Sequence, residues 1–155
     1  MAVSSKDIKQ FLESAMLFKG MSSERRNRYL LMYERATKTT SALTGMPGGG
    51  GADRESVLAN MADAGEEVKK WDSLSEYRRE LVKKFIEDAD IDEHYKNILH
   101  WRYVIGEKWS VILLLLRGDR EMSKRTMYYD HKKALSACAD WVNDTGKYKE
   151  EILYK

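Results

Sequence analysis

Proline and glycine are concentrated at one place in this chain, and that place divides it. Residues 45–51, GMPGGGG, hold the only proline of the 155 residues and five of the ten glycines. Proline lacks the backbone N–H that a helix needs and glycine is a poor helix former, so a helix cannot be sustained here. The absence of proline from the rest of the sequence favours long helices. We therefore predict an all-α protein in which residues 45–51 form a loop between two helices.

Apolar side chains recur at helical spacing on both sides of this loop. Within residues 5–43 they lie close to a heptad repeat, at Ile8, Phe11, Ala15, Phe18, Tyr29, Met32, Ala36 and Leu43. Within residues 53–88 they are Val57, Met61, Ala64, Val68, Trp71, Leu74, Leu81 and Phe85. The first pattern lapses over residues 19–26, so it predicts either one bent helix or a short helix followed by a longer one. We predict that residues 1–88 form a long antiparallel, coiled-coil-like helical hairpin, whose second side joins another copy or the C-terminal part.

An acidic segment, EDADIDE at residues 87–93, follows the predicted hairpin. Asp90 and Glu93 are three residues apart and resemble a capping box at the start of a new helix. We therefore predict a second domain over residues 90–145 and a tail over residues 146–155.

Three short helices are predicted within this second domain. The first runs over residues 92–105 and is stopped by Gly106. The second, over residues 109–116, carries apolar side chains on every face. The third begins after Ser123, a good N-cap residue, and continues to about Trp141. This succession is typical of a helix-turn-helix, whose last helix enters the major groove of DNA.

The excess of positive over negative charge is confined to the same part of the chain. Residues 1–94 hold 15 basic and 17 acidic side chains, residues 95–138 hold 9 and 4, and residues 139–155 hold 3 and 4. The net charges are therefore −2, +5 and −1. This distribution is expected if only the helix-turn-helix meets the phosphates of double-stranded DNA.

The spacing on the third helix separates a core face from an outer face. The core face is predicted to hold Met127, His131, Ala134, Cys138 and Trp141, with Leu135 beside them. The outer face places five side chains in the major groove or on its phosphate walls, namely Lys124, Arg125, Tyr128, Tyr129 and Lys132. Four further basic residues are expected to contact phosphates or to be structural, namely Arg102, Lys108, Arg120 and Lys133.

Motifs of catalytic and metal chemistry are not found. His94, His100 and His131 do not show zinc-site spacing with each other or with the single cysteine, Cys138, and no nucleophile motif occurs. We expect no enzyme activity, no metal and no cofactor, and we expect Cys138 to be an inert core residue.

No segment of the sequence indicates export or a membrane. The apolar run at residues 111–116 is far shorter than the roughly 20 residues that span a bilayer. The first ten residues, MAVSSKDIKQ, lack the apolar run of a secretory signal. We expect a cytoplasmic protein.

Three motifs in the second domain resemble region 4 of sigma-70 factors. They read Ile98-Leu99-x-Trp101-Arg102-Tyr103, then Trp109-x-x-Ile112, then Ser123-x-Arg125-Thr126-Met127-Tyr128-x-x-His131-x-x-Ala134-Leu135. The order is more similar to small phage transcriptional regulators of Gram-positive hosts, of the ArpU and RinA late-gene activator type. Residues 36–47, ATKTTSALTGMP, with the glycine loop also resemble a phage family of this layout. The similarity covers residues from about 25 to 142.

This resemblance implies a sequence-specific DNA-binding regulator of phage or prophage origin, acting in the cytoplasm of a bacterial host as an activator of late genes. It assigns base reading to the five outer-face residues of the third helix. Two other readings stay open. One is a helical adaptor that binds host RNA polymerase or another phage protein, and the other is a DNA-recognition protein for packaging, similar to small terminase subunits.

The chain departs from the family in two places. The turn over residues 117–122 is longer than the three or four residues of a compact helix-turn-helix. The second helix is apolar all round, because it carries Val111, Leu113, Leu114 and Leu115 where the family has acidic residues and a small alanine. The three side chains at issue are Val111, Leu114 and Leu115. We predict that these three side chains pack on the hairpin or on another subunit, and the alternative is that they complete an ordinary core within the chain.

Overall fold

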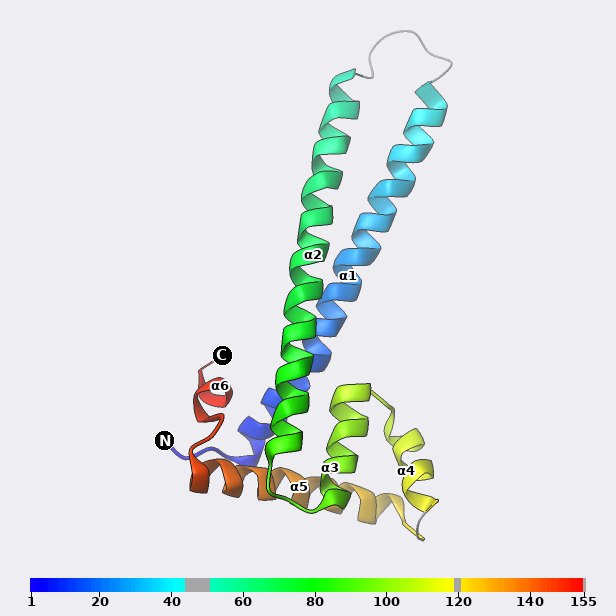
Figure 1. Ribbon diagram of the computed structural model, residues 1–155. Helices are drawn as coiled ribbons and strands as arrows, with labels where there is room; N and C mark the ends of the chain where they lie inside the picture. The colour runs from blue at the N-terminus through cyan, green and yellow to red at the C-terminus, as the bar shows by residue number, and fades with distance from the viewer. Residues whose placement is uncertain (44–50, 119–120, 155) are drawn as a thin grey trace. The chain divides into compact units, whose positions relative to one another are not determined.

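The computed structural model describes residues 1–43, 51–118 and 121–154, and the side chains of residues 1–37, 55–118 and 121–154. Every regular element of these residues is a helix, so the predicted all-α class is confirmed. In chain order the elements are α1 (Ser5–Leu43), α2 (Gly51–Asp88), α3 (Glu93–Leu99), η1 (His100–Ile105), α4 (Trp109–Arg117), α5 (Lys124–Thr145) and α6 (Lys149–Leu153) (Figure 1). The predicted loop at 45–51 lies outside the described residues except for Gly51, where α2 begins.

Helix α1 is a single helix, which decides between the two predicted alternatives. It continues through residues 19–26, where the apolar pattern lapses. A lone glycine in a helix costs only about 1 kcal/mol relative to alanine, and Gly20 is therefore tolerated. Ser22 in the same stretch is buried and its hydroxyl donates a hydrogen bond to the Asp72 carboxylate on α2. In this stretch of α1, a hydrogen bond to α2 thus stands where the apolar pattern has no side chain to pack.

The chain divides into two compact units, and their limits differ from the predicted boundary near Asp88. One unit is Phe18–Glu76, and the other joins Met1–Leu17 with Tyr77–Lys155. The reason is that both ends of the predicted hairpin carry core side chains of the second unit. Phe11 of α1 and Phe85 of α2 are fully buried in the same hydrophobic cluster as Val142 of α5.

The unit Phe18–Glu76 is an antiparallel hairpin. The Phe18 and Trp71 rings lie 5.8 Å apart, and farther along α1 the Tyr29 ring packs against Gly65, so α2 runs back along α1. Next to Trp71, the Asp72 carboxylate accepts hydrogen bonds from Ser22 and Arg26. The bond from Ser22, with a smaller contribution from Arg26, holds the pKa of this carboxyl below its usual value. The hairpin expected from the two apolar patterns is present in this unit.

The second unit has its main core around Phe85. Its ring meets those of Phe11, Trp141 and Tyr148 edge to face, with centroids 5.3, 5.8 and 5.4 Å away. The predicted tail at 146–155 takes part in this core, which corrects that prediction. Helix α6 lies within it, and its Ile152 is only 2% exposed. Burial of this apolar side chain against the cluster is the physical reason that the segment is ordered.

The start of α3 also differs from the prediction. Asp92, not Asp90, precedes the helix, and its side chain makes no capping hydrogen bond, so the predicted capping box is wrong. The backbone explains the shift, because the Ala89 N–H still bonds to the Phe85 carbonyl at the end of α2. The new helix begins where the Tyr95 and Lys96 N–H groups bond to the Asp92 carbonyl.

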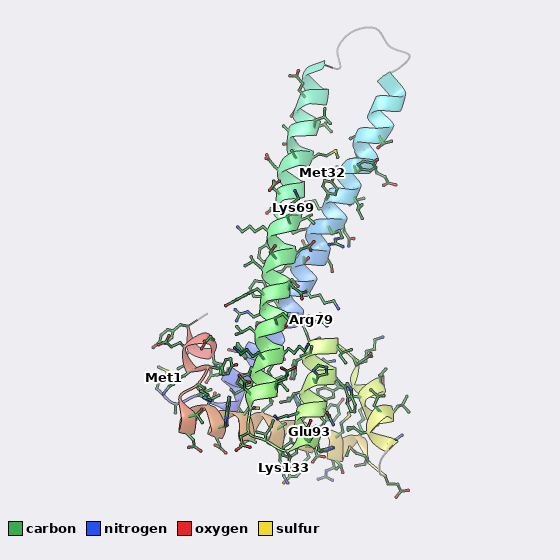
Figure 2. The ribbon with its side chains drawn as sticks, in the orientation of Figure 1. Met1, Met32, Lys69, Arg79, Glu93 and Lys133 are labelled. Carbon is green, nitrogen blue, oxygen red and sulfur yellow. The ribbon has the colours of Figure 1, made fainter. Side chains whose placement is uncertain are left out.

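A smaller core joins α3, η1, α4 and α5. Its buried members are Ile98, Ile112, Leu116, Met122 and Met127, with Trp101, Trp109 and Leu113 packed against them. Figure 2 shows the side chains here, with Glu93 marking the start of α3 and Lys133 marking α5. Gly106 ends η1 with a φ of 85°, a backbone angle that glycine adopts without strain, and this confirms the predicted stop.

Candidate nucleic-acid interface

Helix α5 begins as the sequence predicts. The Ser123 hydroxyl accepts a hydrogen bond of 3.1 Å from the Thr126 N–H, which satisfies one of the unpaired donors of the first turn. The helix then continues to Thr145, four residues beyond the predicted end, and stops at Gly146 with a φ of 73°. The cap fixes the first turns, which carry the predicted DNA-binding residues.

The inner face of α5 is the predicted one. Met127, His131, Ala134, Leu135 and Cys138 are all buried, while Trp141 is half-buried. Burial raises the pKa of the Cys138 thiol to about 12, so this thiol stays protonated at neutral pH. Its predicted core position is confirmed.

The five predicted base-reading residues share the outer face of α5, and all of them are exposed: Lys124, Arg125, Tyr128, Tyr129 and Lys132. Tyr128 is 40% exposed and Tyr129 is 56% exposed, although aromatic side chains normally favour burial. Within the part of the chain that the structure describes, no ion pair or hydrogen bond engages Lys124, Arg125 or Lys132. Their charges are therefore open to a ligand on this side.

A buried hydrogen bond holds α5 against η1. The Tyr103 hydroxyl and His131 Nε2 lie 2.8 Å apart, and the two rings are stacked. Burial is the main cause that lowers the pKa of His131 to about 4, with help from Lys9 and Arg102. Burial also raises the pKa of Tyr103. Both groups are neutral at neutral pH, so the pair serves to position α5.

Arg102 connects η1 to the outer face of α5. Its guanidinium carbon lies 5.0 Å from the centre of the Trp109 ring, and Nη1 donates a hydrogen bond of 3.1 Å to the Glu107 carbonyl. The Trp109 ring in turn contacts Tyr128, with centroids 5.4 Å apart. Arg102 is thus held in place by its neighbours and is half-buried.

The other predicted phosphate-contacting residues are distributed around α4 and α5. Lys108 is exposed directly before α4. Lys133 is exposed on α5, with its Nζ 4.5 Å from the centre of the Tyr129 ring. Arg120 lies outside the described residues.

Two residues of this region were missed by sequence reasoning. Lys9 and Glu13, on α1, line the same cleft as Arg102 and Tyr128. They are separated from α5 by more than one hundred residues, and no local pattern links them to it. Their place in this cleft becomes apparent only from the packing of α1 beside η1 and α5.

The outer face of α4 is apolar and open. Leu114 is 67% exposed and Leu115 is 44% exposed, while Val111 is half-buried. The alternative that these side chains complete a core within the chain is therefore wrong for the two leucines. The reason is geometric, because Ile112 and Leu116 already face the small core and turn Leu114 and Leu115 outward. Contact with another chain stays a prediction.

If Leu114 and Leu115 form an interface between copies of this chain, the wild-type protein is an oligomer, and replacing both leucines by glutamate is expected to lower the mass of the particle in solution to that of a smaller species. Charges on this face would have to be buried without partners in an interface between copies, which is unfavourable. Light scattering would measure the mass, with circular dichroism as the check on helix content. An unchanged mass with retained helicity would contradict an interface between copies at this face.

Neither a metal-binding cluster nor a membrane-spanning helix is seen in the part of the chain that is described. No three His, Cys, Asp or Glu side chains are grouped so that they could hold a metal ion within these residues. None of their helices is both long enough and apolar enough to cross a membrane.

Comparison with known proteins does not assign the chain to a family. No family model matches it, and neither the curated proteins nor the solved structures gave a match. The resemblance to phage regulators with a sigma-70 region 4-like module therefore stays a prediction. The DNA-binding function that the resemblance implies is a proposal, and it rests on the residues of α4 and α5.

Proposed function

We propose that this protein binds double-stranded DNA in a sequence-specific manner and regulates transcription, as a phage or prophage activator of late genes. Helix α5 would read base edges in the major groove, and α4 would support it from outside the groove. The observation that carries the proposal is the open outer face of α5, where Lys124, Arg125 and Lys132 stand beside two exposed tyrosines.

This face fits DNA by charge and by geometry. Lysine and arginine side chains bind phosphates, and arginine also forms paired hydrogen bonds with the edge of guanine. These residues lie on the first turns of a capped helix, which is the part of a recognition helix that contacts bases in helix-turn-helix proteins. The buried bond between Tyr103 and His131 fixes the direction in which they point.

Exposure also separates this proposal from the adaptor reading. Burial of Lys124, Arg125 and Tyr128 against the chain itself would have favoured a degenerate helix-turn-helix that binds only protein. All three side chains are exposed. This exposure supports the DNA-binding proposal, because a DNA-binding protein needs accessible basic side chains for phosphates.

The wild-type protein is expected to retain a random duplex at low salt and to release it steeply as salt rises. Each neutralised phosphate releases counterions, so the logarithm of the binding constant falls linearly with the logarithm of the salt concentration. Gel shift or fluorescence anisotropy over a salt series would measure the slope. Absence of DNA retention at low salt would overturn the proposed function.

The regulatory part of the proposal has its own test. Genome-wide binding of the tagged protein after phage induction should show enrichment upstream of genes that are transcribed late. Enrichment only at the site where packaging begins would instead identify a packaging protein.

A further inference from the structure

A cleft of about 190 Å³ lies beside the outer face of α5, where α1, η1, α4 and α5 meet. Lys9 and Glu13 line it from α1, Arg102 and Tyr103 from η1, Trp109 from α4, and Tyr128 and His131 from α5. The cleft is therefore continuous with the proposed reading surface through Tyr128. None of the proposed base-reading residues other than Tyr128 lines it.

The charges around this cleft favour an anion. Lys9 and Arg102 bring two positive charges, and Glu13 brings one negative charge. His131 adds none at neutral pH, because burial lowers its pKa to about 4. Lys9 Nζ lies 3.7 Å from Glu13 Oε1, and the two side chains are 52% and 50% exposed. A pair so exposed to water is held weakly, so Lys9 can turn to a stronger anion at little cost.

The fixed groups of the cleft suit a phosphate. Arg102 is held by the Trp109 ring and by the Glu107 carbonyl, so little side-chain entropy is lost when it binds. Its guanidinium has five N–H groups, of which the Glu107 carbonyl takes one. Tyr128 lines the cleft, is 40% exposed and carries a phenol hydroxyl that can donate a hydrogen bond. Charge-assisted hydrogen bonds from such groups are the usual way in which proteins hold phosphate oxygens.

We infer that this cleft binds one backbone phosphate of DNA, and that Lys9 of α1 is part of the DNA-binding surface. This inference rests on the proposed function and extends it to the N-terminal helix. Lys9 and Arg102 would hold the phosphate between them, while Glu13 would weaken the attraction. The contact would strengthen binding and fix the register of α5 on the duplex without reading a base.

The test uses the full chain with three substitutions that each remove one charge. Lys9→Gln is expected to reduce the slope of the logarithm of affinity against the logarithm of salt concentration by about 0.9, the value for one lost phosphate contact. Glu13→Gln is expected to change affinity in the opposite direction and tighten binding. Lys84→Gln is the matched control, because Lys84 is exposed on α2 and does not line the cleft. It should leave the slope unchanged.

A second measurement does not depend on a variant. With wild-type protein, bound duplex should protect the Lys9 amine from acylation by a succinimide ester, while Lys84 should react equally with and without DNA. Circular dichroism and melting curves would check that the half-exposed positions 9 and 13 leave the fold intact.

The outcomes separate the two proposals. If wild-type protein binds DNA but Lys9→Gln keeps the full slope and Lys9 is not protected, the cleft does not bind phosphate and the proposed function stands. If wild-type protein does not bind DNA at all, both proposals fail. A reduced slope on random and specific duplexes alike, together with protection of Lys9, is the supporting result.

Discussion

Replacement of Phe85 by alanine is expected to lower the free energy of unfolding by about 3–5 kcal/mol, the usual range for a buried phenylalanine. Phe85 is fully buried, and its ring meets those of Phe11, Trp141 and Tyr148. The substitution would therefore remove contacts with α1, α5 and the segment before α6 at once. Urea unfolding followed by circular dichroism would measure the loss.

Tyr77→Ala is the matched control for this substitution. Tyr77 is also an aromatic residue of α2 but is 67% exposed, so its loss should change stability by less than about 1 kcal/mol. Equal effects of the two substitutions would contradict the assignment of Phe85 to the centre of the core.

Replacement of Arg125 by alanine is expected to cost about 1–3 kcal/mol in binding to the specific DNA site, which is a loss of roughly five- to 150-fold. The reason is that an arginine on the first turn of α5 can form two hydrogen bonds to one guanine. Binding measured on a set of duplexes with single base changes should show relaxed preference at one position. Arg125 is exposed, so stability should change little.

Lys132→Ala provides the comparison for this result. Lys132 lies two turns farther along α5 and is expected to contact a phosphate wall, so its loss should weaken binding to all duplexes alike. If Arg125→Ala also weakened all duplexes equally, Arg125 would be a phosphate contact and base reading would belong to another residue.

Local patterns were sufficient to predict most helices and their capping. The cap at Ser123, the stop at Gly106 and the buried positions of α5 follow from spacing and residue type within a few turns of helix. The open face of α5 follows in the same way, because residues between the buried positions must point outward. These features depend only on residues within a few positions of one another, so they can be predicted from the sequence.

The predicted start of α3 is wrong because a local pattern does not show where the preceding helix ends. Asp90 and Glu93 have the right spacing for a capping box, but spacing does not say where the preceding helix ends. The last backbone hydrogen bond of α2 reaches Ala89, which places the new cap at Asp92. Competition between adjacent elements therefore decided the boundary.

The sequence by itself determined the helical class, the two long helices that form the hairpin and the amphipathic division of α5. Only the tertiary structure decided that the N-terminal part of α1, the C-terminal part of α2 and α6 share the core of Phe85. It likewise decided that Lys9 and Glu13 line the same cleft as Arg102 and Tyr128. It also decided that Leu114 and Leu115 stay exposed. The physical reason is that helix periodicity says which side of a helix is apolar. Which distant helix covers that side, or leaves it open, depends on the packing of the whole chain.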